Sequence, residues 1–198
     1  MARIGLFGGS FNPVHVGHLV IAERAREAAD LQSVLFTPAR RPPHKPHLPL
    51  APEHHRLTML RRAIDGNPNF EICRVELDRE GPSYTYRTVL ELQEDLPTGT
   101  LLCLILGADS ILDLPNWWHA EKLVETVEIV GLKRPGHRVE DTRDLEEAFG
   151  EEKARQIRDA MIPSPLIEIS ATDIRQRRAE GRSIRYMVPG KVREYILA

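Results

Sequence analysis

The chain has 198 residues and a formal net charge of −2, with 41% hydrophobic and 28% charged residues. This size and composition predict one globular domain over residues 1–198 with a full apolar core. A near-neutral charge excludes a general nucleic-acid binder. The longest apolar run, residues 101–106, is too short to cross a bilayer, and the first residues lack the apolar segment of a signal peptide. We therefore expect a cytoplasmic protein with no nucleic-acid or membrane partner; the sequence does not indicate an oligomeric state.

Short apolar runs alternate with helical patterns along most of the chain. Cys73 and Cys103 fall inside expected strands and are interpreted as reduced core residues. Prolines at six positions between residues 38 and 52 exclude a helix or central strand and predict an ordered loop or lid. Strands are expected at residues 3–7, 33–37, 70–77, 101–106, 127–132 and 166–169. Helices are expected at 18–29, 53–65, from an N-cap at Ser83 to before Pro97, at 116–125, 142–160, from Ser170 onward and at 189–197.

Continuous apolar strands separated by helices indicate an α/β protein. They predict a Rossmann-like, doubly wound parallel sheet of five to six strands, covered by helices on both faces. Ligands of such sheets bind at the carboxyl ends of the strands. The glycines, histidines and arginines singled out below all follow expected strands, so we expect them to converge at that edge.

Residues 8–18 read Gly-Gly-Ser-Phe-Asn-Pro-Val-His-Val-Gly-His and join the first strand to the first helix. Glycines let backbone N–H groups approach a ligand, and a helix start adds partial positive charge, so this turn is suited to phosphate. His15 and His18 are close enough in the sequence to face one ligand. We interpret them as hydrogen-bond donors to phosphate oxygens in a transition state. A metal pair, which lacks further ligands, and a capping or core role are the alternatives.

Basic residues gather at 40–45 and again at 175–185, which suits a compact polyanion, although a solvated surface is the alternative for each group. Ser170 and Asp173 form an ordinary capping-box pattern at a helix start. Arg175 lies in the first turn of that helix, where the helix dipole disfavours a cation unless an anion is bound. Together with the first turn, this segment is interpreted as a second helix start directed at phosphates.

These motifs resemble the HxGH nucleotidyltransferase superfamily and, within it, the bacterial nicotinate-nucleotide adenylyltransferase family. Residues 8–18 and 169–175 are a specific pair of matches. Residues 42–45, 83–85, 106–110, 133–136 and Trp117 match more weakly. The resemblance implies a nucleotidyltransferase-type fold whose C-terminal helical part, residues 170–198, completes the ATP site. It also implies transfer of the adenylyl group of ATP to nicotinate mononucleotide, with no covalent enzyme intermediate. The products would be nicotinate adenine dinucleotide and pyrophosphate.

The resemblance also implies roles for single residues, with Mg²⁺ carried mainly by ATP and no metal ligand on the chain. The catalytic residues would be His15, His18, Lys45 and Arg175. The ATP-binding residues would be Gly8, Gly9, Ser10, Phe11, His15, His18, Gly107, Asp109, Ile169, Ser170, Thr172 and Arg175. The mononucleotide-binding residues would be Ser10, Lys45, Tyr84, Thr85, Trp117 and Arg134. Lys45 as an exposed loop lysine and Trp117 as a packing residue are the alternatives. Trp118 is interpreted as structural, with an exchange of roles between the two tryptophans as the alternative.

The chain departs from the family at Arg87, where an acidic residue is usual. We expect this change to affect hydrogen bonding in its own helix, and the preference at the pyridine end, but not the phosphate site. Nicotinamide mononucleotide or phosphopantetheine remain alternative acceptors, and a non-catalytic nucleotide-binding module is a further alternative. The chain lacks the Walker-type phosphate motif. It also lacks the G-x-G-x-x-G motif, and this second absence disfavours an oxidoreductase.

Overall fold

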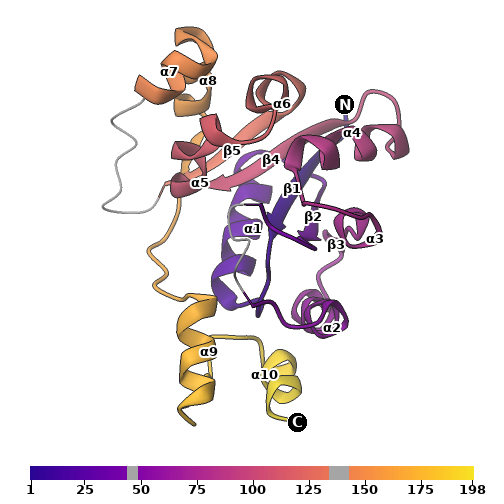
Figure 1. The fold of residues 1–198 in the computed structure, drawn as a ribbon, viewed down its shortest axis with the longest axis vertical. Helices are drawn as coiled ribbons and strands as arrows, with labels where there is room; N and C mark the ends of the chain where they lie inside the picture. The colour runs from indigo at the N-terminus through magenta and orange to yellow at the C-terminus, as the bar shows by residue number, and fades with distance from the viewer. Residues whose placement is uncertain (44–48, 134–142) are drawn as a thin grey trace.

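A six-stranded, all-parallel sheet forms the centre of the computed structural model, which describes residues 1–43, 49–133 and 143–198 (Figure 1). The strand order is β3-β2-β1-β4-β5-β6. The strands are β1 (Arg3–Gly9), β2 (Ser33–Pro38), β3 (Phe70–Ile72), β4 (Leu101–Gly107), β5 (Glu128–Lys133) and β6 (Met161–Pro163). The predicted doubly wound parallel sheet is therefore confirmed.

Alternate residues of the central strands face two separate hydrophobic cores, because successive side chains of a strand point to opposite faces. Within β4, for example, Cys103 and Ile105 join one core, while Leu102 and Leu104 join the other. Both faces are buried, which explains why the central strands read as continuous apolar runs.

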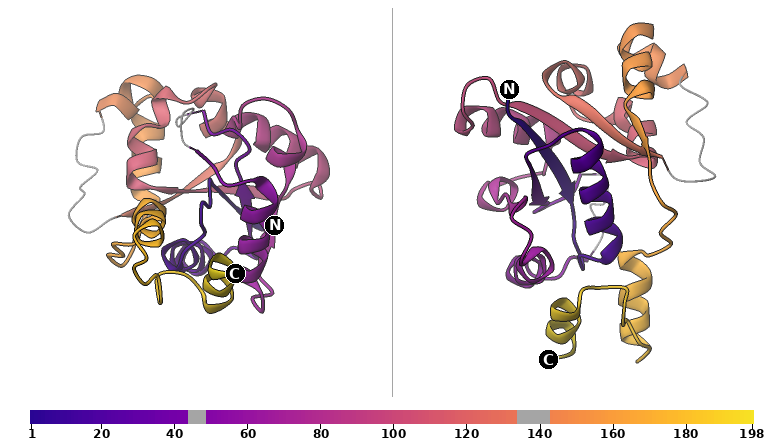
Figure 2. Two further views of the ribbon diagram at one scale, coloured as in Figure 1. Left: turned by 60° about the horizontal axis from the view of Figure 1, so that its bottom comes forward. Right: turned by 180° about the vertical axis from the view of Figure 1, so that it is seen from behind.

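Two groups of helices cover these faces. The first core includes residues of α1 (Val16–Ala28), α2 (Glu53–Ile64), α9 (Ala171–Ala179) and α10 (Gly190–Leu197). The second includes residues of α4 (Thr85–Asp95), α5 (Ala108–Leu112), the 3₁₀ turn η1 (Leu114–Asn116), α6 (Ala120–Thr126), α7 (Arg143–Phe149) and α8 (Glu151–Asp159). Both α9 and α10 lie beyond one end of the sheet, opposite α7 and α8 (Figures 1 and 2). No helix in the described ranges is long and apolar enough to cross a membrane.

Two predicted strands are wrong in part or in full. The strand expected at 70–77 ends at Ile72, and the chain turns into the short helix α3 (Val75–Asp78), where Glu76 and Leu77 are buried. No strand forms at 166–169: Leu166 is exposed and so gains nothing from strand burial. The sheet edge is instead occupied by β6, whose pairing with β5 places Met161 beside Gly131.

Helix boundaries differ from the prediction in smaller ways. The first helix begins at Val16 rather than residue 18, and α5 and η1 precede α6, which begins at Ala120 rather than residue 116. The charged stretch expected at 142–160 is split into α7 and α8 by Gly150, whose φ of 80° is left-handed. The described part of the proline-rich segment contains neither helix nor sheet strand between β2 and α2, as predicted.

The cysteines are free thiols, as predicted. Cys103 is buried in β4, whereas Cys73 is half-buried and lies just after β3 rather than inside a strand.

Tight packing between β5 and its neighbours yields a stability prediction. A Cβ at Gly131 would overlap Met161 Sδ and lie 2.7 Å from Ile111 Cδ1. We expect Gly131→Ala to lower the free energy of unfolding by about 1–3 kcal/mol through overpacking, as measured by urea denaturation. Gly190→Ala at the start of α10 is the control, because a Cβ there meets nothing within 4 Å. Equal stability of the two variants would contradict the packing argument.

Candidate active site

The topology creates a crevice between β1 and β4. The chain builds β1, β2 and β3 toward one edge and then returns to add β4, β5 and β6 on the other side of β1. Ligands bind at such a switch point, outside the carboxyl ends of the strands. A cavity of about 410 Å³ lies there, lined by residues at the ends of β1 and β4, by residues that follow β2, and by the starts of α4 and α5.

Eight of the residues predicted to bind nucleotide line this one cavity. They come from segments far apart in the sequence and are Gly8, Gly9, Ser10, Tyr84, Thr85, Gly107, Asp109 and Trp117. The parallel register explains this convergence, because Gly8 and Gly9 pair with the last residues of β2 while β4 ends on the other side of β1.

The turn after β1 holds its shape through a buried aromatic ring. Phe11 has a φ of 43°, which is uncommon for a bulky residue and stores backbone strain. Its ring is 1% exposed and packs edge-on against Phe7 and His18. The structure therefore places the Phe11 side chain in the core, and a Cβ at Gly9 would press on that ring at 3.1 Å.

His15 and His18 lie together at the start of α1, just outside the lining of the cavity. Their rings stack with centroids 3.6 Å apart, and the His15 backbone N–H donates to His18 Nδ1 at 3.1 Å. Since Nδ1 of His18 accepts this bond, the neutral His18 ring carries its proton on Nε2. His18 is therefore held as a donor through Nε2, the atom that would meet an acceptor.

Both imidazoles are neutral in the free protein. Burial lowers the pKa of His15 to about 4. Burial, together with the neighbouring His15 ring, lowers the pKa of His18 well below its usual range. Each neutral ring can donate one hydrogen bond to an arriving anion.

The second predicted helix start lies beside the first turn. Arg175 Nη1 donates to the carbonyl oxygen of Asn12 at 2.7 Å, and Arg175 Nη2 donates to Thr172 Oγ1 at 3.1 Å. Ser170 caps α9 by accepting from the Asp173 N–H at 3.1 Å, as the capping-box pattern predicted. Ile169 packs against the first core. Arg175 therefore joins this segment to the phosphate turn, although none of the residues predicted in the segment lines the cavity itself.

Lys45 and Arg134 lie outside the described residues. Their predicted roles at the phosphates and at the mononucleotide therefore stay predictions.

Aromatic side chains form one end of the cavity. Trp117 is half-buried, and its Nε1–H donates to Asp113 Oδ2 at 3.2 Å. Trp118 also lines the cavity and stacks on Tyr84 with ring centroids 4.9 Å apart. Its exposed fraction of 43% differs from the buried packing role expected for it. Both tryptophans therefore present aromatic surface to a bound ring.

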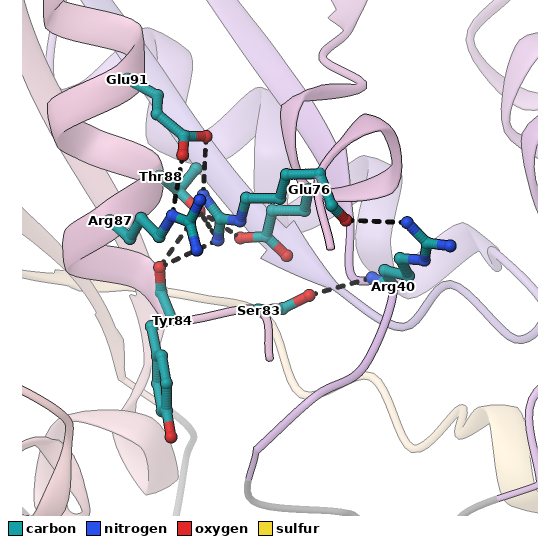
Figure 3. Close-up of polar contacts among 8 residues, drawn as sticks. Arg40, Glu76, Ser83, Tyr84, Arg87, Thr88 and Glu91 are labelled. Atoms are coloured by element: carbon teal, nitrogen blue, oxygen red, sulfur yellow. Dashed lines mark hydrogen bonds and ion pairs between the residues drawn. The ribbon is translucent and has the colours of Figure 1, made fainter. Parts of the chain in front are cut away.

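The start of α4 is anchored by buried charges rather than by the predicted Ser83 cap (Figure 3). Ser83 Oγ instead accepts from the backbone N–H groups of Arg40 and Arg41. The Arg79 side chain is 8% exposed, and its Nη2 donates to the Tyr84 carbonyl oxygen at 3.2 Å and to Thr88 Oγ1 at 2.8 Å. This network fixes the backbone of residues 83–85 at the cavity wall.

The unusual Arg87 is accommodated within α4. Its Nε donates to Glu91 Oε1 at 2.9 Å, and the other carboxylate oxygen of Glu91 accepts from Arg79 Nη1 (Figure 3). Both cations share one carboxylate, so Arg87 is hydrogen-bonded within its own helix. Arg87 itself is exposed and is not among the residues that line the cavity.

Sequence reasoning missed two acidic residues that line the cavity, Glu76 and Asp113. It also missed that Ser83, another lining residue, anchors the loop at Arg40. Glu76 is 6% exposed, and its Oε1 accepts from Thr88 Oγ1 at 2.7 Å. Glu76 is one of three charged residues in the alternating strand expected at 70–77, so no local pattern distinguished it from the others.

The fold and this site define the class of protein. The chain matches the cytidylyltransferase-like family over residues 6–177. A probable nicotinate-nucleotide adenylyltransferase of Thermomicrobium roseum is 44% identical over 99% of this chain and 89% of its own length. One of Roseiflexus castenholzii is 46% identical over 99% of this chain and 96% of its own length. The chain therefore belongs to the nicotinate-nucleotide adenylyltransferase family.

A solved structure shares the fold. That of Plasmodium falciparum nicotinic acid mononucleotide adenylyltransferase complexed with NaAD superposes with a TM-score of 0.75 at 21% identity, covering 100% of this chain and 95% of that one.

The buried carboxyl group of Glu76 yields a pH prediction. Burial raises the pKa of Glu76. As the pH rises above the ordinary Glu value of about 4.3, the unfolded chain loses this proton while the folded protein keeps it, so stability falls until the folded pKa is passed. The free energy of unfolding of Glu76→Gln relative to wild type should therefore increase as the pH rises from 4 to 8. Glu71→Gln, an exposed change on β3, controls for lost charge. A difference that is flat with pH would contradict the assignment.

Proposed function

We propose that this protein transfers the adenylyl group of ATP to nicotinate mononucleotide, giving nicotinate adenine dinucleotide and pyrophosphate. The observation that carries the proposal is the meeting of two helix starts at one turn. Arg175 of α9 binds the Asn12 carbonyl of the turn that also bears His15 and His18, beside an aromatic-lined cavity. The family relationship over nearly the whole chain supports the same activity.

The triphosphate of ATP is placed at the turn and at α9. Backbone N–H groups of Gly8, Gly9, Ser10 and Phe11 would approach it, and the helix dipoles at the starts of α1 and α9 add partial positive charge. Fixed donors come from the side chains of His15, His18, Ser170, Thr172 and Arg175. Gly107 and Asp109, with Ile169, are assigned to the adenosine.

The mononucleotide is placed in the aromatic end of the cavity. A flat heteroaromatic ring fits Trp117, whose face is the preferred partner of such rings. The N-terminus of α4 at Tyr84 and Thr85 favours the negative carboxylate of nicotinate over a neutral carboxamide. Ser10 would contact the mononucleotide phosphate, with Lys45 and Arg134 as further predicted contacts.

The proposed reaction needs no protein nucleophile. An oxygen of the mononucleotide phosphate bonds to the α-phosphorus of ATP while the bond from that phosphorus to the bridging oxygen breaks and pyrophosphate leaves. Catalysis then consists of positioning and of stabilising negative charge that grows on the leaving group. His18 Nε2–H, His15 and Arg175 are the described groups that would meet that charge.

We expect Mg²⁺ to arrive with ATP. Within the described residues no cluster of three or more His, Cys, Asp or Glu side chains could cage a metal ion. Mg²⁺ commonly binds through substrate phosphates and waters with one or two protein ligands, which fits a site of this composition. When bound, the ion would neutralise phosphate charge. A cytoplasmic location is part of the same proposal, because free thiols such as Cys73 and Cys103 persist in reducing compartments.

An assay of the pure protein tests the function. With ATP and Mg²⁺, we expect pyrophosphate release with nicotinate mononucleotide to exceed that with nicotinamide mononucleotide by at least about tenfold in kcat/KM, which equals about 1.4 kcal/mol. Omitting Mg²⁺ should abolish turnover. Release only with phosphopantetheine, or no release with any acceptor, would overturn the proposal.

His18 yields a kinetic prediction. His18→Ala should lower kcat by about 10²-fold or more with a much smaller change in KM for ATP, because its donor acts on charge that develops in the transition state. His54→Ala, which removes an exposed imidazole from α2, is the control and should leave kcat unchanged. An unchanged kcat in His18→Ala would remove this residue from the mechanism.

A further inference from the structure

Arg56 is a fully buried arginine that the proposed mechanism does not use. It lies on α2 with 0% of its surface exposed and is among the largest fully buried side chains of the protein. Its Nη1 donates to the carbonyl oxygens of Ser10 at 2.9 Å and Ala39 at 2.8 Å, and its Nε donates to that of Ala51 at 3.1 Å. One guanidinium group therefore joins the turn after β1, the residue after β2 and the segment before α2.

The charge of Arg56 has no carboxylate counter-ion among the described residues. The carboxylate that most favours its charge, Glu53, forms an ion pair with Arg40 Nε at 3.3 Å instead. Arg56 Nη2 is buried and has no hydrogen-bond partner in the described part of the chain. Burial lowers the pKa of Arg56, yet a guanidinium group stays protonated in proteins.

Such a charge is costly, because desolvation of an ion that lacks a counter-ion amounts to several kcal/mol. Three carbonyl dipoles offset part of this cost. An apolar side chain of similar length would avoid it, so packing alone does not account for an arginine at this position.

The three carbonyl groups point toward Arg56, and this fixes the direction of the N–H group on the opposite side of each peptide. In a trans peptide the N–H of the next residue points away from the preceding C=O. While the Ala39 carbonyl accepts from Arg56, the Arg40 N–H donates to Ser83 Oγ, which lines the cavity. Ser10 and Ala39 line the cavity too, so the charge of Arg56 lies directly behind the part of the cavity wall that these two residues form.

We propose that Arg56 is a positioning residue of the phosphate site: it holds the Ser10 and Ala39 carbonyls away from the ligand and adds a fixed, water-shielded positive charge behind the turn. The electrostatic attraction of this charge for a polyphosphate is strong because burial reduces screening. A bound polyanion supplies the missing counter-charge. The inference rests on the proposed function only in taking ATP as the ligand.

Binding measurements on the full chain test this role. We expect Arg56→Met to weaken ATP binding by about tenfold or more in calorimetry, and Arg56→Lys, which keeps the charge, to recover part of that loss. Arg61→Met removes an exposed charge from the same helix and should bind ATP like wild type. If Arg56→Met does not fold, Arg56→Gln replaces it, because the Gln amide can still donate to carbonyls and so support folding. It lacks the positive charge, so we again expect weaker ATP binding.

A merely structural role predicts a different pattern. Arg56→Met and Arg56→Lys would then both melt at lower temperature while their folded protein bound ATP within about twofold of wild type, and this result would overturn the proposal. Failure of the wild type to adenylylate nicotinate mononucleotide would overturn the proposed function alone, because ATP binding by the Arg56 and Arg61 variants is measured without an acceptor.

Discussion

The central constraint in this protein is the hydrogen bonding of the turn that follows β1. A turn open to a ligand has few backbone partners of its own, and buried backbone polar groups must be satisfied. Arg56 of α2 binds the Ser10 carbonyl, Arg175 of α9 binds the Asn12 carbonyl, and the Asn12 side chain binds the backbone of Pro49 and Ala51. Helices distant in the sequence therefore hold one turn by its carbonyls.

This arrangement gives the site a polar side and an aromatic side. On one side, cations and helix starts surround the turn, and burial lowers the pKa values of His15 and His18. On the other side, the tryptophans and the start of α4 form a cavity wall that Arg79 and Glu76 hold from behind. Buried charged residues support the backbone on both sides, since Arg56 binds three carbonyl oxygens and Arg79 binds that of Tyr84.

Regular features were predictable because they depend on local pattern. Apolar strands separated by helices identified the parallel sheet, and Ser170 was correctly predicted to cap α9. The errors fell where tertiary contacts overrode that pattern. Residues 75–78 form a helix because Glu76 finds a buried partner in Thr88, and Ser83 does not cap α4 because the backbone of Arg40 and Arg41 takes its oxygen. The edge strand at Met161 was missed because its apolar run is only three residues long.

The sequence by itself determined the class of fold, the phosphate turn with its two histidines and the second helix start. Each of these depends on a pattern of residues that are consecutive in the chain. The tertiary structure alone decided that Arg175 reaches Asn12, that Trp118 faces the cavity beside Trp117, and that Arg56 lies buried behind Ser10. These contacts join residues from separate elements. Their geometry follows from how the helices pack on the sheet, and no local pattern encodes it.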